Sequence, residues 1–116
     1  MSLCVCLCAH AAVKILPEHD QLVPLGGTLR LTCIDGYTPN WTRRGTHKLH
    51  GTGNRAEDIR DGQHGFSVHR LGSTASELVK NNVTVYDEAV YVCTALEGNF
   101  SSHYQLNVTV VDSKLN

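Results

Sequence analysis

The chain has 116 residues, of which 41% are hydrophobic and 18% are charged, and its formal net charge is -1. This composition predicts one globular domain and excludes an intrinsically disordered chain. The small net charge gives the molecule no general attraction to nucleic acid or to an anionic membrane. No apolar run approaches the roughly 18 residues that cross a bilayer, so we expect no direct membrane insertion of this chain.

The N-terminal segment 1–12 is apolar and contains Cys4, Cys6 and Cys8. Ala9-His10-Ala11 fits the small-x-small pattern of a signal-peptidase site, so we interpret 1–12 as a signal peptide, short or truncated. The apolar stretch is only about seven residues long and no Lys or Arg precedes it, so a hydrophobic first strand is the alternative. A metal or redox role for the three thiols is a further alternative, although no cluster of zinc spacing completes such a site.

The segment 13–111 alternates short apolar stretches with turns and shows no helical periodicity. Stretches of roughly ten residues between turns are typical of an all-β sandwich. We expect the chain to switch sheets between the first two strands, and 97–99 to form a hairpin turn before the last. The predicted strands are 13–17, 21–24, 28–34, 40–43, 66–69, 77–85, 89–96 and 103–111.

Two regions depart from regular strand patterns. Residues 44–65 are rich in Gly, His, Asn, Asp and Arg, which predicts loops with at most one brief strand near 47–50. Within 77–85 the apolar residues Leu78 and Val79 are adjacent instead of alternating, and a bulge near Asn81-Asn82 would restore the register. The polar residues 112–116 are interpreted as a tail or linker.

The segment 86–93, Tyr-Asp-Glu-Ala-Val-Tyr-Val-Cys, predicts a turn followed by a half-buried strand. Alternate side chains of a strand share a face, so three of its residues should point into the core. The stretch 29–33, Leu-Arg-Leu-Thr-Cys, alternates in the same way, and the only tryptophan follows eight residues later. Together these positions resemble an immunoglobulin superfamily domain of the variable-like or intermediate set. The matching residues are Cys33, Trp41, Asp87, Ala89, Tyr91 and Cys93.

This resemblance implies an immunoglobulin-like, two-sheet antiparallel β-sandwich with Greek-key connections over 13–111. It implies a disulfide between Cys33 and Cys93, which would persist only in an oxidising compartment and therefore predicts an extracellular location. It also gives Tyr91 the structural role of a tyrosine corner, whose hydroxyl bonds back to the preceding loop.

In the resembled family, Asp87 would pair with an arginine at the start of the fourth strand. Here Gly65 occupies that position. The resemblance therefore implies that Arg60 or Arg70 substitutes, or that the ion pair is absent. The alternative is a turn carboxylate that caps local backbone amides.

Four N-glycosylation sequons are present, where roughly one would arise by chance, and this excess predicts a secreted glycoprotein. Sugars on the predicted outward positions of one sheet would crowd its outer face. We therefore expect a partner to use the opposite sheet or the loops of 44–65. The acceptor residues are Asn40, Asn82, Asn99 and Asn107, of which Asn40 and Asn107 are predicted to share that face.

A basic cluster lies within 43–55 and is followed at once by acidic residues. It could contact an acidic partner or a sulfated glycan, or form a solvated loop of balanced charge. His47 and His50 have a weak metal-site spacing, but we assign no metal and no cofactor. The candidate contact residues are Arg43, Arg44, Lys48 and Arg55.

The chain lacks the motifs of nucleophilic catalysis and of phosphate binding, so we predict no catalytic residues and no enzyme activity. By analogy with the resembled family, we predict an extracellular recognition module in cell adhesion or immune-type recognition. Its partner would be another protein on a cell surface or in secretion, with weak homophilic pairing as one form. The alternatives are a secreted decoy or modulator of host immune receptors, and a structural spacer of a larger ectodomain.

Overall fold

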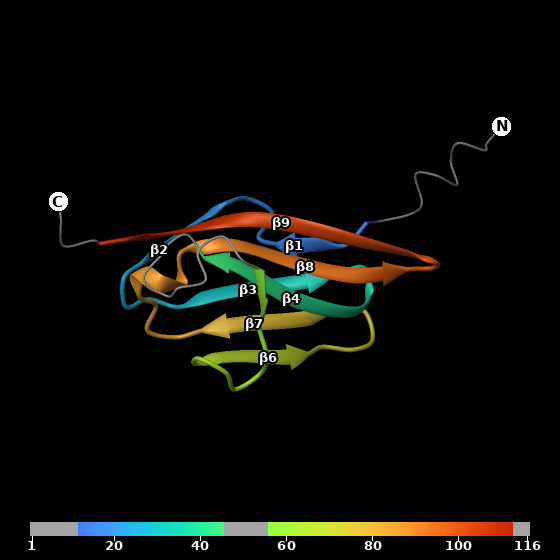
Figure 1. Ribbon diagram of the computed structural model, residues 1–116, viewed down its shortest axis with the longest axis horizontal. Helices are drawn as coiled ribbons and strands as arrows, with labels where there is room; N and C mark the ends of the chain where they lie inside the picture. The colour runs from blue at the N-terminus through green and yellow to red at the C-terminus, as the bar shows by residue number, and fades with distance from the viewer. Residues whose placement is uncertain (1–11, 46–55, 113–116) are drawn as a thin grey trace.

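The computed structural model describes residues 12–45 and 56–112, which form two β-sheets packed face to face (Figure 1). The predicted all-β, immunoglobulin-like sandwich is confirmed. One sheet has the spatial order β1-β3-β7-β6: β1 (Lys14–Leu16), β3 (Leu29–Ile34), β7 (Ser76–Lys80) and β6 (Phe66–Arg70). The other has the order β2-β9-β8-β4-β5: β2 (Gln21–Pro24), β9 (Phe100–Val111), β8 (Ala89–Glu97), β4 (Tyr37–Gly45) and β5 (Ala56–Asp58).

The core lies between β3 of one sheet and β8 of the other. Both strands bury alternate residues, as their sequences predict. The predicted disulfide between Cys33 and Cys93 joins the two strands, with Cα atoms 6.3 Å apart. Trp41 of β4 is buried beside it, and its indole N–H donates a hydrogen bond to Ser76 Oγ at 3.1 Å. The bond satisfies a polar group that burial would otherwise leave without a partner.

The chain changes sheets between its first two strands, as predicted. β1 pairs antiparallel with β3, whereas β2 pairs in parallel with β9. The peptide bond between Leu16 and Pro17, at the end of β1, is cis. Proline has no N–H to contribute to a strand ladder, so its place between the two pairings costs no hydrogen bond.

The predicted strand 77–85 is present but shorter, and its predicted bulge is wrong. β7 ends at Lys80, and its register with β3 and with β6 is unbroken. Leu78 faces the core, whereas Val79 lies on the outer face opposite Arg30 and is nevertheless buried. Asn82 then adopts a φ of 53°, a turn conformation that asparagine tolerates. The turn leads into η2 (Val85–Asp87), a single 3-10 turn before β8.

Two strands begin earlier than predicted because their first residues also pair with β8, Tyr37 opposite Leu96 after a register shift and Phe100 opposite Glu97. β4 begins at Tyr37, and β9 begins at Phe100 after the two-residue turn Gly98-Asn99. Gly98 has a φ of 63°, which allows this tight hairpin. β5 pairs with β4 and forms an edge of its sheet.

Several predictions lie outside the described residues. These are the signal peptide with Cys4, Cys6 and Cys8, the brief strand near 47–50, and all of the tail after Asp112. Within 12–45 and 56–112, no helix has the length and apolar character to span a membrane.

Candidate functional site

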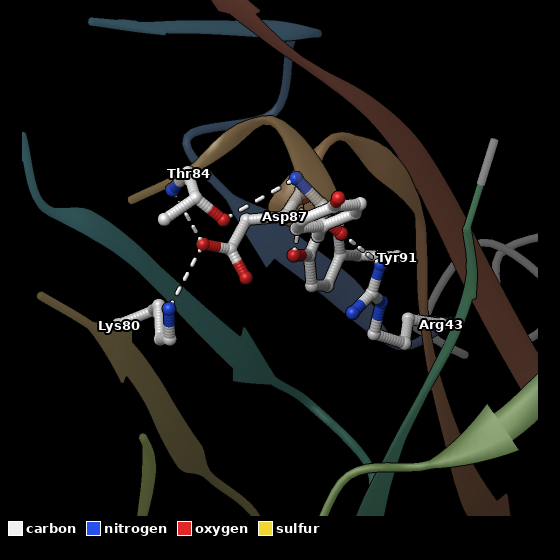
Figure 2. A network of polar contacts seen from close by, with 6 residues as sticks. Arg43, Lys80, Thr84, Asp87 and Tyr91 are labelled. Carbon is white, nitrogen blue, oxygen red and sulfur yellow. Dashed lines mark hydrogen bonds and ion pairs between the residues drawn. The ribbon is translucent and has the colours of Figure 1, made fainter. Parts of the chain in front are cut away.

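A buried polar network joins the two sheets beneath η2 (Figure 2). Asp87 Oδ2 accepts hydrogen bonds from Lys80 Nζ at 2.9 Å and from the Thr84 backbone N–H at 2.8 Å. The Thr84 side chain in turn accepts from the Tyr86 N–H and completes a capping box. Asp87 is therefore both a local cap, as one interpretation of the sequence held, and one half of an ion pair.

The predicted arginine partners of Asp87 are wrong. Arg70 ends β6, opposite Ser76, whereas Lys80 lies opposite Phe66 at the other end of the same strand pair. Arg60 instead lies 3.7 Å from Asp58 in an exposed pair. Lys80 can pair with Asp87 because it is the last residue of β7 and its ammonium reaches the aspartate of η2.

Gly65 occupies the position at which the resembled family has an arginine, and it leaves space for the Lys80 side chain. Its φ is +82°, and a Cβ added there would lie 2.9 Å from Lys80 Cε. A side chain at position 65 and the observed path of the Lys80 side chain therefore exclude each other.

Tyr91 forms the predicted tyrosine corner. Its hydroxyl donates a hydrogen bond to the Asp87 carbonyl at 2.6 Å. Burial raises the pKa of Tyr91 far above its ordinary value, because water cannot reach the phenolate. Arg43 lies over the same ring, with its guanidinium carbon 5.9 Å from the ring centroid, and donates to the Tyr86 carbonyl.

This position of Arg43 corrects its prediction as a partner or glycan contact. β4 directs Trp41 and Arg43 inward, and Arg43 is only 9% exposed. Arg44 points outward and is exposed, as that prediction requires. Lys48 and Arg55 lie outside the described residues.

A hollow of about 370 Å³ borders this network, and its charged residues are of both signs. Because acidic and basic side chains both line it, the hollow has no single sign of charge that would attract one kind of ion. Among the described residues, no three His, Cys, Asp or Glu side chains gather to hold a metal ion. The residues around its rim include Glu57, Asp58, Arg60, Gln63 and His64.

The outer face of the five-stranded sheet carries two sequons, as predicted. Asn40 lies opposite Thr94 and Asn107 lies opposite Val90, and both asparagines are exposed. Their partners on β8, Val90 and Thr94, are four positions apart, which is about 13 Å along the strand. Sugars at both positions would flank the half-buried Val92 between them.

Asp20 holds the Asn107 sequon in place. Its carboxylate accepts the Asn107 backbone N–H at 2.9 Å and the Asn107 side-chain amide at 3.3 Å. The backbone bond, followed by the side-chain bond, lowers the pKa of Asp20 from its ordinary value. Both bonds favour the charged carboxylate, which can only accept hydrogen bonds.

The sequence analysis missed a cluster of exposed apolar side chains at one end of the sandwich. They come from the β3–β4 turn, the β6–β7 turn and the β8–β9 hairpin, which lie together at the right-hand end of Figure 1. The Thr38 N–H donates to the Ser73 carbonyl at 3.1 Å and joins the first two of these turns. We name this cluster the apolar end: Tyr37, Leu71, Leu96 and Phe100, exposed by 57%, 55%, 49% and 75%.

A hollow of about 380 Å³ lies within the apolar end. It is lined by Tyr37, by Phe100 and by the hairpin residues Glu97, Gly98 and Asn99. One carboxylate oxygen of Glu97 is buried and has no hydrogen-bond partner among the described residues. A signal for this surface exists in the sequence. The alternation that turns Ala95 inward turns its neighbour Leu96 outward, beyond the reach of the core.

Comparisons with known proteins show the fold alone. No family model matches the chain, and no curated protein matches it. Among solved structures 1728 chains match, so the architecture is widespread and carries no single function. One of them is a chain in the structure described as "Structural basis of T cell specificity and activation by the bacterial superantigen toxic shock syndrome toxin-1". It is 19% identical with a TM-score of 0.59, over 87% of this chain and 100% of that chain.

Proposed function

We propose that this protein is an extracellular, non-enzymatic recognition module that binds another protein through the apolar end. The observation that carries the proposal is an exposed apolar group at one end of the sandwich, in which Tyr37 lies opposite Leu96 and lines one hollow with Phe100. Leu71 is exposed in the β6–β7 turn, which a hydrogen bond joins to the β3–β4 turn. Contiguous apolar patches on soluble domains mark interaction sites, because their exposure to water is unfavourable unless a partner covers them.

The strand order supports membership of the variable-like or intermediate set of the immunoglobulin superfamily. β2 joins the five-stranded sheet beside β9, and β5 extends it beyond β4. Variable-type domains add strands at that edge, whereas constant-type domains do not. Domains of this kind act in cell adhesion and in immune-type recognition, which are the roles we propose.

The disulfide between Cys33 and Cys93 supports the extracellular location, since such bonds are rare where thiols are kept reduced. The arrangement around Asp87 supports the non-enzymatic assignment. Its carboxylate is bonded to Lys80 and to the Thr84 backbone, and the Tyr91 hydroxyl is bonded to a carbonyl. These contacts give the network a structural role.

A binding screen tests the proposal. The domain, produced without N-linked glycans and multimerised on a fluorescent carrier, is presented to a library of cell-surface and secreted proteins. We expect a partner of micromolar affinity, weakened about tenfold or more by Tyr37→Ser or Phe100→Ser. The matched control is Leu22→Ser, since Leu22 is 73% exposed but lies on β2, away from the apolar end. Equal effects of Phe100→Ser and Leu22→Ser would refute the assigned surface, and the absence of any partner would favour the spacer.

A further inference from the structure

We propose that an N-linked glycan on Asn99 packs into the hollow between Tyr37 and Phe100 and masks the apolar end. The inference rests on the proposed function, because it makes the glycan a regulator of the same surface. It assigns the hollow an occupant that the chain itself specifies, through the sequon Asn99-Phe100-Ser101.

The position of Asn99 favours modification. It forms the two-residue hairpin turn with Gly98 and is exposed. Glu97 and Phe100 are paired across the base of this turn, so the asparagine stands at its tip. A sugar attached there begins at the wall of the hollow, because Asn99 itself lines it.

The lining of the hollow suits a sugar ring. Tyr37 and Phe100 are the two aromatic residues of the lining, and both are more than half exposed. Sugar rings present an apolar face of C–H groups, which packs well against an aromatic ring. The volume of the hollow, about 380 Å³, falls within the range of small-ligand sites.

The Asn107 sequon offers no comparable surroundings. The hollow beside it is lined by Asp20, Glu88 and other residues without a single aromatic side chain. The Asn107 amide is also bonded to Asp20. An Asn107 glycan therefore has no aromatic ring to rest on, and we expect it to extend into solvent.

The modification is a substitution at a sugar carbon. The Asn99 Nδ2 attacks the anomeric carbon of an oligosaccharide carried on a lipid diphosphate, which the secretory pathway supplies. The new N–C bond forms as the C–O bond to the diphosphate breaks, and the lipid diphosphate leaves with the electron pair. The amide loses one proton to a base of the transferase and keeps the other.

Secretory expression behind an added signal sequence tests this inference with the wild type and four variants. Ser101→Ala and Asn99→Gln destroy the sequon at different residues, Ser101→Thr retains it, and Asn40→Gln removes a sequon elsewhere, at an exposed position of β4. Glycopeptide mass spectrometry gives occupancy, and the fluorescence of an apolar dye, bis-ANS, reports the exposed surface. We expect Asn99 to be occupied in wild type and Ser101→Thr, and dye fluorescence to rise severalfold only in Ser101→Ala and Asn99→Gln.

Adding Phe100→Ser to Ser101→Ala should abolish that rise, since it removes an aromatic wall of the hollow. An unmodified Asn99 in the secreted wild type, or equal dye fluorescence in all variants, would overturn the inference. Failure of the proposed function is seen separately. If the dye results are as expected but the Ser101→Ala protein finds no partner in the screen, the masking glycan stands and the protein-binding role falls.

Discussion

Lys80 and Asp87 form a buried ion pair at the end of the sandwich, with Nζ 2.9 Å from Oδ2 and side chains that are 12% and 6% exposed. β7 supplies the lysine and η2 supplies the aspartate, so the pair fixes the turn that leads into β8. Lys80 Nζ also lies 5.7 Å from the centroid of the Phe66 ring. The pair exists because Gly65 leaves space for the lysine side chain.

Removal of the lysine charge should destabilise the domain. We expect Lys80→Met to lower the free energy of unfolding by about 3 kcal/mol, because it leaves the Asp87 carboxylate buried without a cation. The control is Arg30→Met, which breaks a pair with Glu77 of the same 2.9 Å length whose arginine is 60% exposed. That change should cost less than about 1 kcal/mol. Guanidinium unfolding of the two variants measures the difference, and equal losses would contradict the prediction.

Alanine substitutions at Gly65 and Gly62 distinguish the cost of backbone strain from the cost of a side-chain contact. Their φ values are +82° and +83°, but an added Cβ meets Lys80 only at position 65. We expect Gly62→Ala to cost about 1 kcal/mol from the left-handed backbone, and Gly65→Ala about 2 kcal/mol. Combination with Lys80→Ala should remove the excess at position 65. A cycle of urea-unfolding measurements shows this coupling, and additive effects in the cycle would exclude it.

The buried hydroxyl of Tyr91 predicts a loss of stability at alkaline pH. Its pKa is raised above the ordinary value of 10.0, by burial first, with a smaller opposing effect of Arg43. The folded state keeps the proton where the unfolded chain has lost it. This contribution to stability is therefore complete below pH 10 and is lost as the pH rises through the folded-state pKa.

We expect Tyr91→Phe to cost about 1 kcal/mol at pH 7, through the lost bond to the Asp87 carbonyl, and to flatten the alkaline decline. The slope removed is at most about 1.4 kcal/mol per pH unit. Tyr104→Phe is the control, since its hydroxyl bonds the Glu18 carbonyl at an exposed site. Stability curves measured from pH 7 to 11 with the disulfide intact test this. Parallel curves for wild type and Tyr91→Phe would refute it.

The Asp20 carboxylate should titrate below its ordinary range. The Asn107 backbone bond is the main cause of its lowered pKa, and the Asn107 side-chain bond is the second. Asn107→Ala removes only the second bond, so we expect the pKa of Asp20 to rise part of the way back. The stability linked to this group is present above its unfolded-state pKa and is lost as the pH falls through the lowered value. Carboxyl carbon NMR measures both proteins, and an unchanged Asp20 titration in Asn107→Ala would contradict the assignment.

Local alternation made the sandwich predictable from the sequence. Ala89, Tyr91 and Cys93 share a face in any extended strand, and so do Leu29, Leu31 and Cys33, because the period of two is a property of the backbone. The resemblance of these positions to an immunoglobulin domain implied the disulfide and the tyrosine corner, and both are present.

Sequence alone thus determined which side chains face the core, since that depends on neighbours along one chain. Only the tertiary structure decided which side chains contact one another across different strands. It placed Lys80 rather than Arg60 or Arg70 against Asp87, and it set the Arg43 guanidinium over the Tyr91 ring. It also brought Tyr37 and Phe100, 63 residues apart, to the two sides of one hollow. Such contacts depend on where each strand ends and on the space left by residues such as Gly65. The alternation of residues along one strand predicts neither of these.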